Sequence, residues 1–280
     1  MCEFCARHGD GKKWYLQAKN YSEDLIADLR RQKTIARWFN YFETGLRKDL
    51  DRMETAFPKL PRVARYLISS LMTRRHKREH FGQVVPIEDI ERVFEITNSI
   101  VRVPCVCRRA TLGRDVHYCL AVSASPEGKT MGDLIDPSYL EGPDTKGMDE
   151  LTKEEALSFM QGLEKEGLMH SVWTFGTPFI GGVCNCDRSD CAAMRSTVKH
   201  GVKVMFKAEY VAELDRDLCT GCRSCLRFCQ FGAMGFSSSD KKAYIDVLKC
   251  YGCGVCRAGC STGAVSLRER SEVPLVARNW

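Results

Sequence analysis

The apolar residues of the first hundred positions recur with the spacing of amphipathic helices. Between residues 25 and 53 they return about every 3.6 positions, which predicts a long helix with Ser22 at its N-cap position. Pro58 and Pro61 end this pattern, and a second helix is predicted over 62–78. The face of this second helix contains Val63, Tyr66, Leu67, Ser70 and Leu71.

A change from helical to strand-like spacing follows. Pro86 stands at the start of a third predicted helix, over 87–98. Residues 100–103 and 116–122 are rich in β-branched and apolar side chains, which favours two strands. The region after residue 100 is therefore expected to mix strands with helices.

Polar and glycine-rich segments dominate the next part of the chain. Residues 125–150 are predicted as loop, and so is most of 170–200. Between them, Thr152 and Glu155 form a capping box ahead of an apolar run, which predicts a helix that ends near Gly167.

The cysteine content is the part of the composition that says most about function. The chain has 280 residues, 16 of them cysteine, and its N-terminus lacks the basic and apolar regions of a secretory signal. No run approaches the length of a membrane span. A secreted disulfide protein and a membrane-spanning protein are thus both disfavoured. We expect a cytoplasmic protein whose thiols bind metal, because cytosolic thiols are kept reduced.

The formal net charge of +6 counts every cysteine as neutral. A four-thiolate [4Fe–4S] centre carries about −2, so two centres bring the total to about +2. The basic residues are therefore explained as counter-charge, and no motif with base-reading geometry supports nucleic-acid binding.

The C-terminal part contains a duplicated cysteine motif. C-x2-C-x2-C-x3-C occurs first at 219–229 and again 31 residues later, at 250–260. This pattern resembles the bacterial two-cluster ferredoxin domain over about residues 211–268. In that family three cysteines of each run bind one [4Fe–4S] cluster and the fourth binds the other cluster. The resemblance implies one cluster on Cys219, Cys222, Cys225 and Cys260, and a second on Cys250, Cys253, Cys256 and Cys229.

The motif departs from the family in one respect. The family has proline after the fourth cysteine of each run, whereas this chain has Gln230 and Ser261 there. The ligand cysteines are unaffected by this departure, although the loop geometry is expected to differ. Zinc is the alternative metal for paired cysteines, but it leaves the third cysteine of each run unexplained.

Eight further cysteines lie outside the duplicated motif. They are Cys2, Cys5, Cys105, Cys107, Cys119, Cys184, Cys186 and Cys191. We expect a third [4Fe–4S] cluster, or another metal centre such as zinc, on the two C-x-C pairs, with Cys119 or Cys191 as an exchangeable ligand. Cys2 and Cys5 could contribute to a fourth centre. A buried free thiol is the alternative for Cys119, because cysteine also packs as a small apolar residue.

Short motifs give a weaker likeness to a group of poorly characterised anaerobic proteins with a C-terminal two-cluster ferredoxin domain. They are Pro104-Cys-Val-Cys-Arg108, Glu166-Gly-Leu-Met-His170 and Gly182-Val-Cys-Asn-Cys-Asp187. The predicted fold class is α+β, with a helical and mixed N-terminal region and a ferredoxin-like βαββαβ-type domain. The expected division is a helical region at 1–100, a metal-site domain at 101–205, the ferredoxin domain at 206–270 and a tail at 271–280.

These features predict an anaerobic iron–sulfur electron-transfer protein that relays single electrons and serves a larger oxidoreductase complex as subunit or partner. Two alternatives stay open. One is a redox enzyme whose middle site has an open metal position near a base such as His117 or His170. The other is a structural or regulatory iron–sulfur protein that holds zinc in the middle site.

Overall fold

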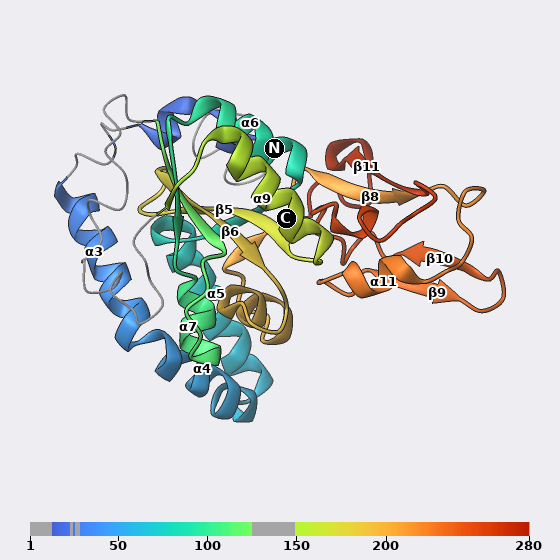
Figure 1. Ribbon diagram of the computed structural model, residues 1–280. Coiled ribbons are helices and arrows are strands. Elements are labelled where there is room, and N and C mark those ends of the chain that lie inside the picture. Colours follow the sequence, from blue (N-terminus) through green and yellow to red (C-terminus); the bar gives the residue numbers. More distant parts are fainter. Residues whose placement is uncertain (1–12, 23–24, 26–28, 125–148, 280) are drawn as a thin grey trace.

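The computed structural model describes residues 13–22, 25, 29–124 and 149–279, and shows a sheet domain joined to a smaller C-terminal domain (Figure 1). Cys2 and Cys5, expected to contribute to a metal site, lie outside these residues. Both domains mix helices with strands, so the expected α+β class is confirmed.

Seven strands form the sheet of the larger domain, in the order β4-β2-β3-β6-β5-β1-β7. All neighbouring pairs are antiparallel except β1 and β7, which are parallel. The strands are β1 (Gly82–Val85), β2 (Ser99–Val103), β3 (Cys119–Ser123), β4 (Asp149–Glu150), β5 (Met169–Thr174), β6 (Ile180–Cys186) and β7 (Met205–Phe206). Residue 100, the expected domain boundary, lies inside β2.

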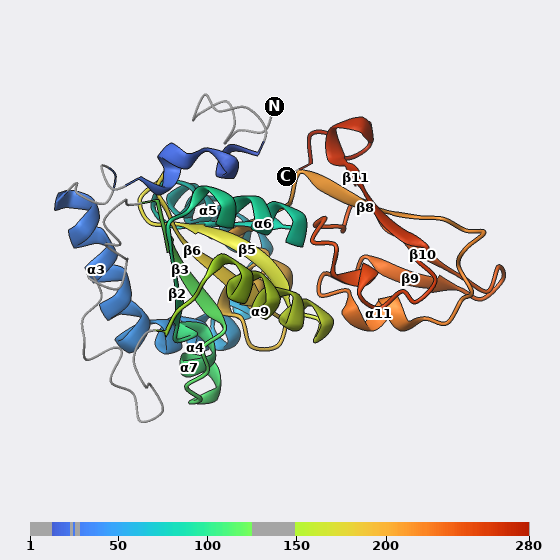
Figure 2. The same cartoon turned by 45° about the horizontal axis from the view of Figure 1, so that its top comes forward.

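Helices cover both faces of this sheet (Figures 1 and 2). One face packs against α6 (Ile87–Ile96), α9 (Lys153–Lys165) and the 3₁₀ turns η1 (Trp14–Leu16) and η2 (Ala18–Tyr21). The other face carries α3 (Leu29–Thr44), α4 (Leu46–Thr55), η3 (Phe57–Lys59), α5 (Arg62–Glu79), α7 (Val106–Leu112), α10 (Ala192–Met194) and the π-helical turn η5 (Arg195–Lys199).

Side chains of each strand alternate between two hydrophobic clusters, one on each face of the sheet. On β6, Val183 packs in the cluster beneath α6 and α9, whereas Cys184 and Cys186 join the cluster on the opposite face. Successive strand residues point to opposite faces, so a C-x-C pair on a strand places both thiols on one side. This alternation positions the candidate site described below.

The C-terminal domain consists of two antiparallel ribbons, β8 with β11 and β9 with β10. Its elements are β8 (Tyr210–Leu214), α11 (Ser224–Phe228), β9 (Met234–Ser237), β10 (Lys242–Ile245), η6 (Val255–Arg257), β11 (Val265–Glu269) and η7 (Arg270–Glu272). The second repeat has only the 3₁₀ turn η6 where the first has α11, so the full βαββαβ pattern is not reproduced.

Several predicted elements are confirmed, and one prediction is wrong. The helix after Pro86 is α6, the strands near residues 100 and 120 are β2 and β3, and the long N-terminal helix is divided into α3 and α4 at Gly45. The segment 170–200, predicted mostly as loop, instead supplies β5 and β6 at the centre of the sheet. Gly181 and Gly182 suggested a loop, but both lie in β6, where Gly182 pairs with Trp173 of β5.

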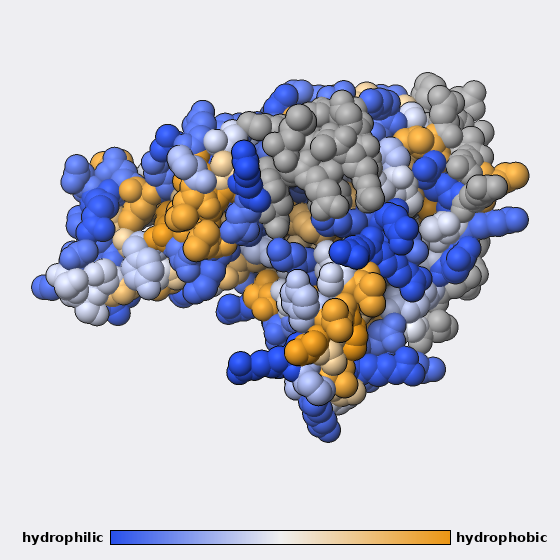
Figure 3. Space-filling view, turned by 180° about the vertical axis from the view of Figure 1, so that it is seen from behind, coloured by the Kyte–Doolittle hydropathy of each residue, from blue (hydrophilic) through white to orange (hydrophobic). Residues whose placement is uncertain are grey.

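Helix α5 has the predicted length, but its apolar face is exposed. Val63, Tyr66, Leu67 and Leu71 each keep more than half of their surface open to solvent. Figure 3 shows the resulting apolar side chains over the lower helical part of the molecule, where α5 lies. The opposite side of α5, which includes Met72 and His76, faces the sheet domain.

The capping box at the start of α9 is present as predicted. The Thr152 hydroxyl accepts a hydrogen bond from the Glu155 amide, and the Glu155 carboxylate accepts one from the Thr152 amide. Replacing Thr152 with alanine removes one of these bonds, at a typical cost of about 1 kcal/mol. We expect amide hydrogen exchange in the first turn of α9 to become roughly fivefold faster in Thr152→Ala. Ser158→Ala, on an exposed position of the same helix, should leave that exchange unchanged.

Candidate metal centres

Four cysteines of the C-terminal domain surround one small pocket. Cys219, Cys222 and Cys225 come from the first motif, and Cys260 comes from the end of the second. Burial, followed by the neighbouring Cys260 thiol, raises the pKa of Cys225 to about 11. The structure therefore brings together the set of thiols that the family resemblance implied for one cluster.

The other four cysteines form a second group on the side of the domain that faces the sheet. Burial, followed by the neighbouring thiols of Cys250 and Cys229, raises the pKa of Cys256 to about 12. Burial, followed by the neighbouring thiols of the same group, also raises the pKa of Cys253. The sulfur of Cys250 accepts a hydrogen bond from the Ala212 amide at 3.3 Å, and that of Cys229 accepts one from the Ala233 amide at 3.1 Å. Such donors stabilise thiolate sulfur in cluster sites.

Two glycines let the backbone pass close to neighbouring carbonyl groups in the cysteine loops. Gly221 and Gly252 have φ angles of +74° and +72°. A Cβ atom at Gly221 would lie 2.1 Å from the Lys241 oxygen, and one at Gly252 would lie 2.1 Å from the Tyr210 oxygen. Only glycine fits both the left-handed conformation and these contacts.

The two groups differ in exposure. Cys222 of the first group is exposed, whereas Cys250, Cys253 and Cys256 of the second are buried. Cys219 and Cys225 of the first group are also buried, so the exposure of that group is concentrated at Cys222, whereas Cys253 of the second group packs against the sheet domain.

A third group contains all six middle cysteines. Cys105 is the N-cap residue of α7 and Cys107 lies in its first turn. Cys119 begins β3, and Cys191 is the N-cap residue of α10. Cys184 and Cys186 lie on β6, where their shared strand face directs both thiols to the same side. The six side chains line one wall of a single cavity.

Contacts between sulfur atoms join the six thiols in two sets of three, in which Cys119 contacts Cys105 and Cys184, and Cys191 contacts Cys107 and Cys186. The sulfurs of Cys186 and Cys191 lie 3.2 Å apart. A hydrogen bond with Cys119, followed by burial, raises the pKa of Cys105 well above its usual value. A hydrogen bond with Cys191, followed by burial, acts on Cys107 in the same direction. The thiols therefore hold protons at neutral pH unless a cation replaces those protons.

One buried cation already stands beside this group. The Arg108 guanidinium donates hydrogen bonds to the Cys105 sulfur at 3.5 Å and to the Asn185 carbonyl oxygen at 3.0 Å. It also forms an ion pair with Asp187 and is 4% exposed. A role for Arg108 was not predicted, and its position directly after the C-x-C pair was the available signal. It offsets negative charge on the thiols and joins α7 to the end of β6.

The residue between Cys184 and Cys186 points to the other face of the sheet. There the Asn185 carboxamide oxygen lies 2.6 Å from His170 Nδ1, and its nitrogen donates to the Tyr118 carbonyl oxygen at 2.6 Å. Burial lowers the pKa of His170 to about 4, so the ring is neutral and Nδ1 donates. These bonds hold β6 in place from the face of the sheet opposite the six thiols. His170 therefore lies across the sheet from the six thiols and does not face them as a base.

The arrangement does not resemble a site for a single ion. Within the described residues, no three His, Cys, Asp or Glu side chains are placed to hold one metal ion. This geometry therefore supports neither the expected zinc site nor the expected third cluster. The eight C-terminal cysteines are not placed around a single ion either, although the motif they form is that of a cluster-binding domain.

Comparison with known families decides the nature of the C-terminal part. Residues 218–270 match the family model described as 4Fe-4S dicluster domain. The C-terminal domain is of the ferredoxin type. The match implies two [4Fe–4S] clusters and indicates iron–sulfur electron transfer. No curated protein matches the chain. Among the described helices, none combines the length and apolarity needed to cross a bilayer.

The departure from the ferredoxin pattern at Gln230 has a structural explanation. Its side-chain oxygen accepts a hydrogen bond from the Arg188 amide at 3.0 Å, and its nitrogen donates to the Gly167 carbonyl oxygen at 2.7 Å. Both partners belong to the sheet domain, so Gln230 holds the ferredoxin-type domain against it. A proline at this position could make neither bond.

Further polar contacts join the two domains. Arg257, next to Cys256, forms an ion pair with Glu88 on α6 through both guanidinium NH₂ groups. The Ala208 amide donates to the Tyr251 carbonyl oxygen at 2.8 Å. Lys207 donates to the Leu248 carbonyl oxygen at 2.6 Å. These bonds fix the buried end of the ferredoxin-type domain at a defined position.

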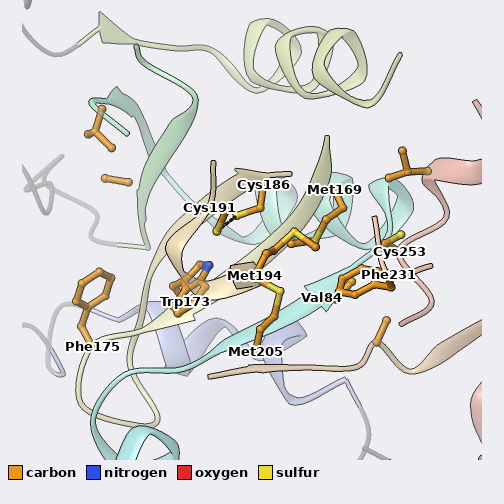
Figure 4. Packing of buried hydrophobic residues seen from close by; sticks show 14 of the residues in the cluster. Val84, Met169, Trp173, Phe175, Cys186, Cys191, Met194, Met205, Phe231 and Cys253 are labelled. Carbon is orange, nitrogen blue, oxygen red and sulfur yellow. Dashed lines mark hydrogen bonds between the residues drawn. The ribbon is translucent and has the colours of Figure 1, made fainter. Parts of the chain in front are cut away.

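Apolar residues fill the space between the ferredoxin-type domain and the six-cysteine group. Phe231 and Tyr251 stack with their ring centroids 3.9 Å apart. Figure 4 shows Met169, Met194 and Met205 lying between Cys186 and Cys191 on one side and Phe231 and Cys253 on the other. All of these residues except Tyr251, which packs against them, belong to one buried hydrophobic cluster. Water is thereby excluded between the two cysteine groups.

The close approach at Gly252 gives a test of the second cysteine group. In Gly252→Ala, the new methyl group would clash with the Tyr210 carbonyl, so we expect the loss of roughly four iron atoms per chain. Gly263→Ala is the matched control, because Gly263 has a φ of +68° but open space around its Cβ position. Iron and sulfide are measured after anaerobic reconstitution. Equal losses in both variants would show that backbone strain alone matters.

Restoring the family residue tests the contact made by Gln230. We expect Gln230→Pro to keep its iron but to lose both hydrogen bonds to the sheet domain, so that the Arg188 amide exchanges at least roughly fivefold faster. Hydrogen exchange followed by mass spectrometry measures this change. Ser261→Pro makes the same replacement in the second repeat and should not alter exchange at Arg188. Unchanged exchange in Gln230→Pro would contradict the assigned contact.

Proposed function

We propose that this chain is an iron–sulfur electron-transfer protein that connects a redox partner to a metal–thiolate centre within its own sheet domain. One observation carries the proposal. Cys253 of the ferredoxin-type domain and five of the six middle cysteines meet in a single hydrophobic cluster, with polar contacts fixing the domains on either side.

The ligand sets of the ferredoxin-type domain are part of this proposal. Cys219, Cys222, Cys225 and Cys260 would hold one [4Fe–4S] cluster, and Cys229, Cys250, Cys253 and Cys256 the other. The bound clusters supply one-electron storage. The protein holds their thiolates, donates amide hydrogen bonds to sulfur and excludes water at the buried end.

The six-cysteine group is proposed as the third metal centre. A [4Fe–4S] cluster needs four thiolate ligands, and six thiols in contact supply that number with two remaining. The raised pKa values of Cys105 and Cys107 fit such a role, because a bound metal core supplies the positive charge that these buried thiols require. Arg108 adds a fixed positive charge at the same wall.

The partner is proposed to be a redox protein, and a larger oxidoreductase suits the fixed geometry. It would dock at the open end of the ferredoxin-type domain, where Cys222 is exposed. All fourteen cysteines in the described residues are free thiols. A reducing, oxygen-poor cytoplasm would preserve them, since glutathione and thioredoxin keep thiols reduced.

Metal analysis of the anaerobically reconstituted full chain tests the third centre. We expect about twelve iron atoms per chain, and about eight when Cys105, Cys107, Cys184 and Cys186 are all replaced by serine, because only two thiols of the middle group then remain and a cluster needs four. The ferredoxin-type signals in paramagnetic resonance should persist. Cys2→Ser with Cys5→Ser is the control and should retain about twelve. About eight iron atoms in the wild-type chain, with or without zinc, would contradict the third cluster and leave the two-cluster domain intact.

A further inference from the structure

The six middle cysteines line only part of a larger cavity. The cavity has a volume of about 470 Å³ and lies between the sheet and helices α3, α4 and α5. This volume is within the range of about 300 to 1,000 Å³ found for small-molecule sites in proteins. A metal–thiolate centre on the six cysteines would use only part of the lining, and the remaining lining residues have no role in it.

Another part of the lining consists of aromatic rings that contact one another, and two of them, Trp173 and Phe175, pack in the same hydrophobic cluster as Cys184 and Cys186. The His80 ring centroid lies 4.7 Å from that of Trp38, 4.9 Å from that of Trp173 and 4.8 Å from that of Phe175. These residues come from α3, the end of α5 and the end of β5, which are far apart in sequence. Flat rings offer broad faces and edges to other aromatic groups, which favours ring-shaped ligands over flexible chains.

The remaining lining of the cavity is mainly apolar. Helices α4 and α5 and the turn η3 contribute Leu46, Leu50, Met53, Phe57, Leu60 and Met72. The ion pair between Asp49 and Arg52 lies at the solvent edge, since these side chains are 48% and 78% exposed. A ligand of the interior would therefore meet hydrocarbon and ring surfaces on most sides.

Charged groups inside the cavity are either neutralised or already paired. Burial lowers the pKa of His80 to about 3, and its Nδ1 lies 2.6 Å from the Thr174 carbonyl oxygen. Burial also lowers the pKa of His76, so both imidazoles are neutral at pH 7. Arg108 is engaged by Asp187 and by the cysteine wall. An anionic ligand would lose its hydration without gaining a free counter-charge.

We propose that this cavity is a binding site for an uncharged aromatic molecule of about two fused rings. The aromatic wall formed by Trp38, His80, Trp173 and Phe175 would contact its faces and edges, and α4 and α5 would enclose it. The ligand would lie against the six thiols. Binding depends on the shape and polarity of the cavity and stands independently of electron transfer.

Equilibrium dialysis of the full chain, reconstituted anaerobically, tests this site with indole as the probe. Indole is uncharged and has two fused rings, so we expect one molecule bound per chain. Indole-3-acetate carries a carboxylate on the same ring system and should bind at least tenfold more weakly. Indole-3-acetate binding as tightly as indole, or the absence of indole binding at millimolar concentration, would overturn the proposal.

Two variants on consecutive residues of α5 locate the bound probe. Met72 lines the cavity, so Met72→Trp fills part of it and should weaken indole binding at least tenfold. Leu71 lies on the exposed side of the same helix and is 65% exposed, so Leu71→Trp should bind indole as the wild type does. An effect of Leu71→Trp equal to that of Met72→Trp would place the probe on the surface and refute the cavity site.

Folding of the filled variant is checked by circular dichroism and iron content. Should Met72→Trp lose structure, Met53→Trp fills the cavity from α4 and carries the same expectation. Tight indole binding in a folded filled variant contradicts the proposal. The iron content of these preparations reports separately on the third metal centre, so failure of one proposal is distinguishable from failure of the other.

Discussion

A thiolate removed from water must meet positive charge, and this requirement shapes both domains. Burial raises the pKa of Cys256 in the ferredoxin-type domain, and a hydrogen bond with Cys191, followed by burial, raises the pKa of Cys107 in the sheet domain. Without a cation, such thiols stay protonated and chemically inert. Three features of the chain can stabilise negative charge on sulfur. They are the loops that gather thiols where a metal core can bind, the amide groups that donate hydrogen bonds to sulfur, and the buried guanidinium of Arg108.

The ferredoxin-type domain could be predicted from the sequence because its chemistry is encoded locally. Three ligands of each group fall within seven residues, and the duplication repeats them. Other local signals were equally informative: the Thr152 and Glu155 capping box starts α9, and Pro86 precedes α6. Each of these features depends on residues that are neighbours along the chain.

Features that depend on the tertiary fold were not predictable. β5 and β6 lie at the centre of the sheet, and Gly181 and Gly182 suggested a loop although both belong to β6, which pairs with β3 and β5. The sequence placed two C-x-C pairs in one expected centre, but it could not show that all six thiols meet, because Cys107 and Cys191 come together only through the packing of α7 and α10. Gln230 was recognised only as a departure from the family, since both of its partners lie in another domain.

The two hydrogen bonds of Gln230 and the ion pair between Arg257 and Glu88 hold the ferredoxin-type domain in a fixed position against the sheet domain. A tethered carrier that must search for its acceptor slows down as solvent viscosity rises. In the proposed route both cysteine groups keep fixed positions, so electron transfer between them would require no diffusion. Only the encounter with a redox partner would then depend on solvent viscosity.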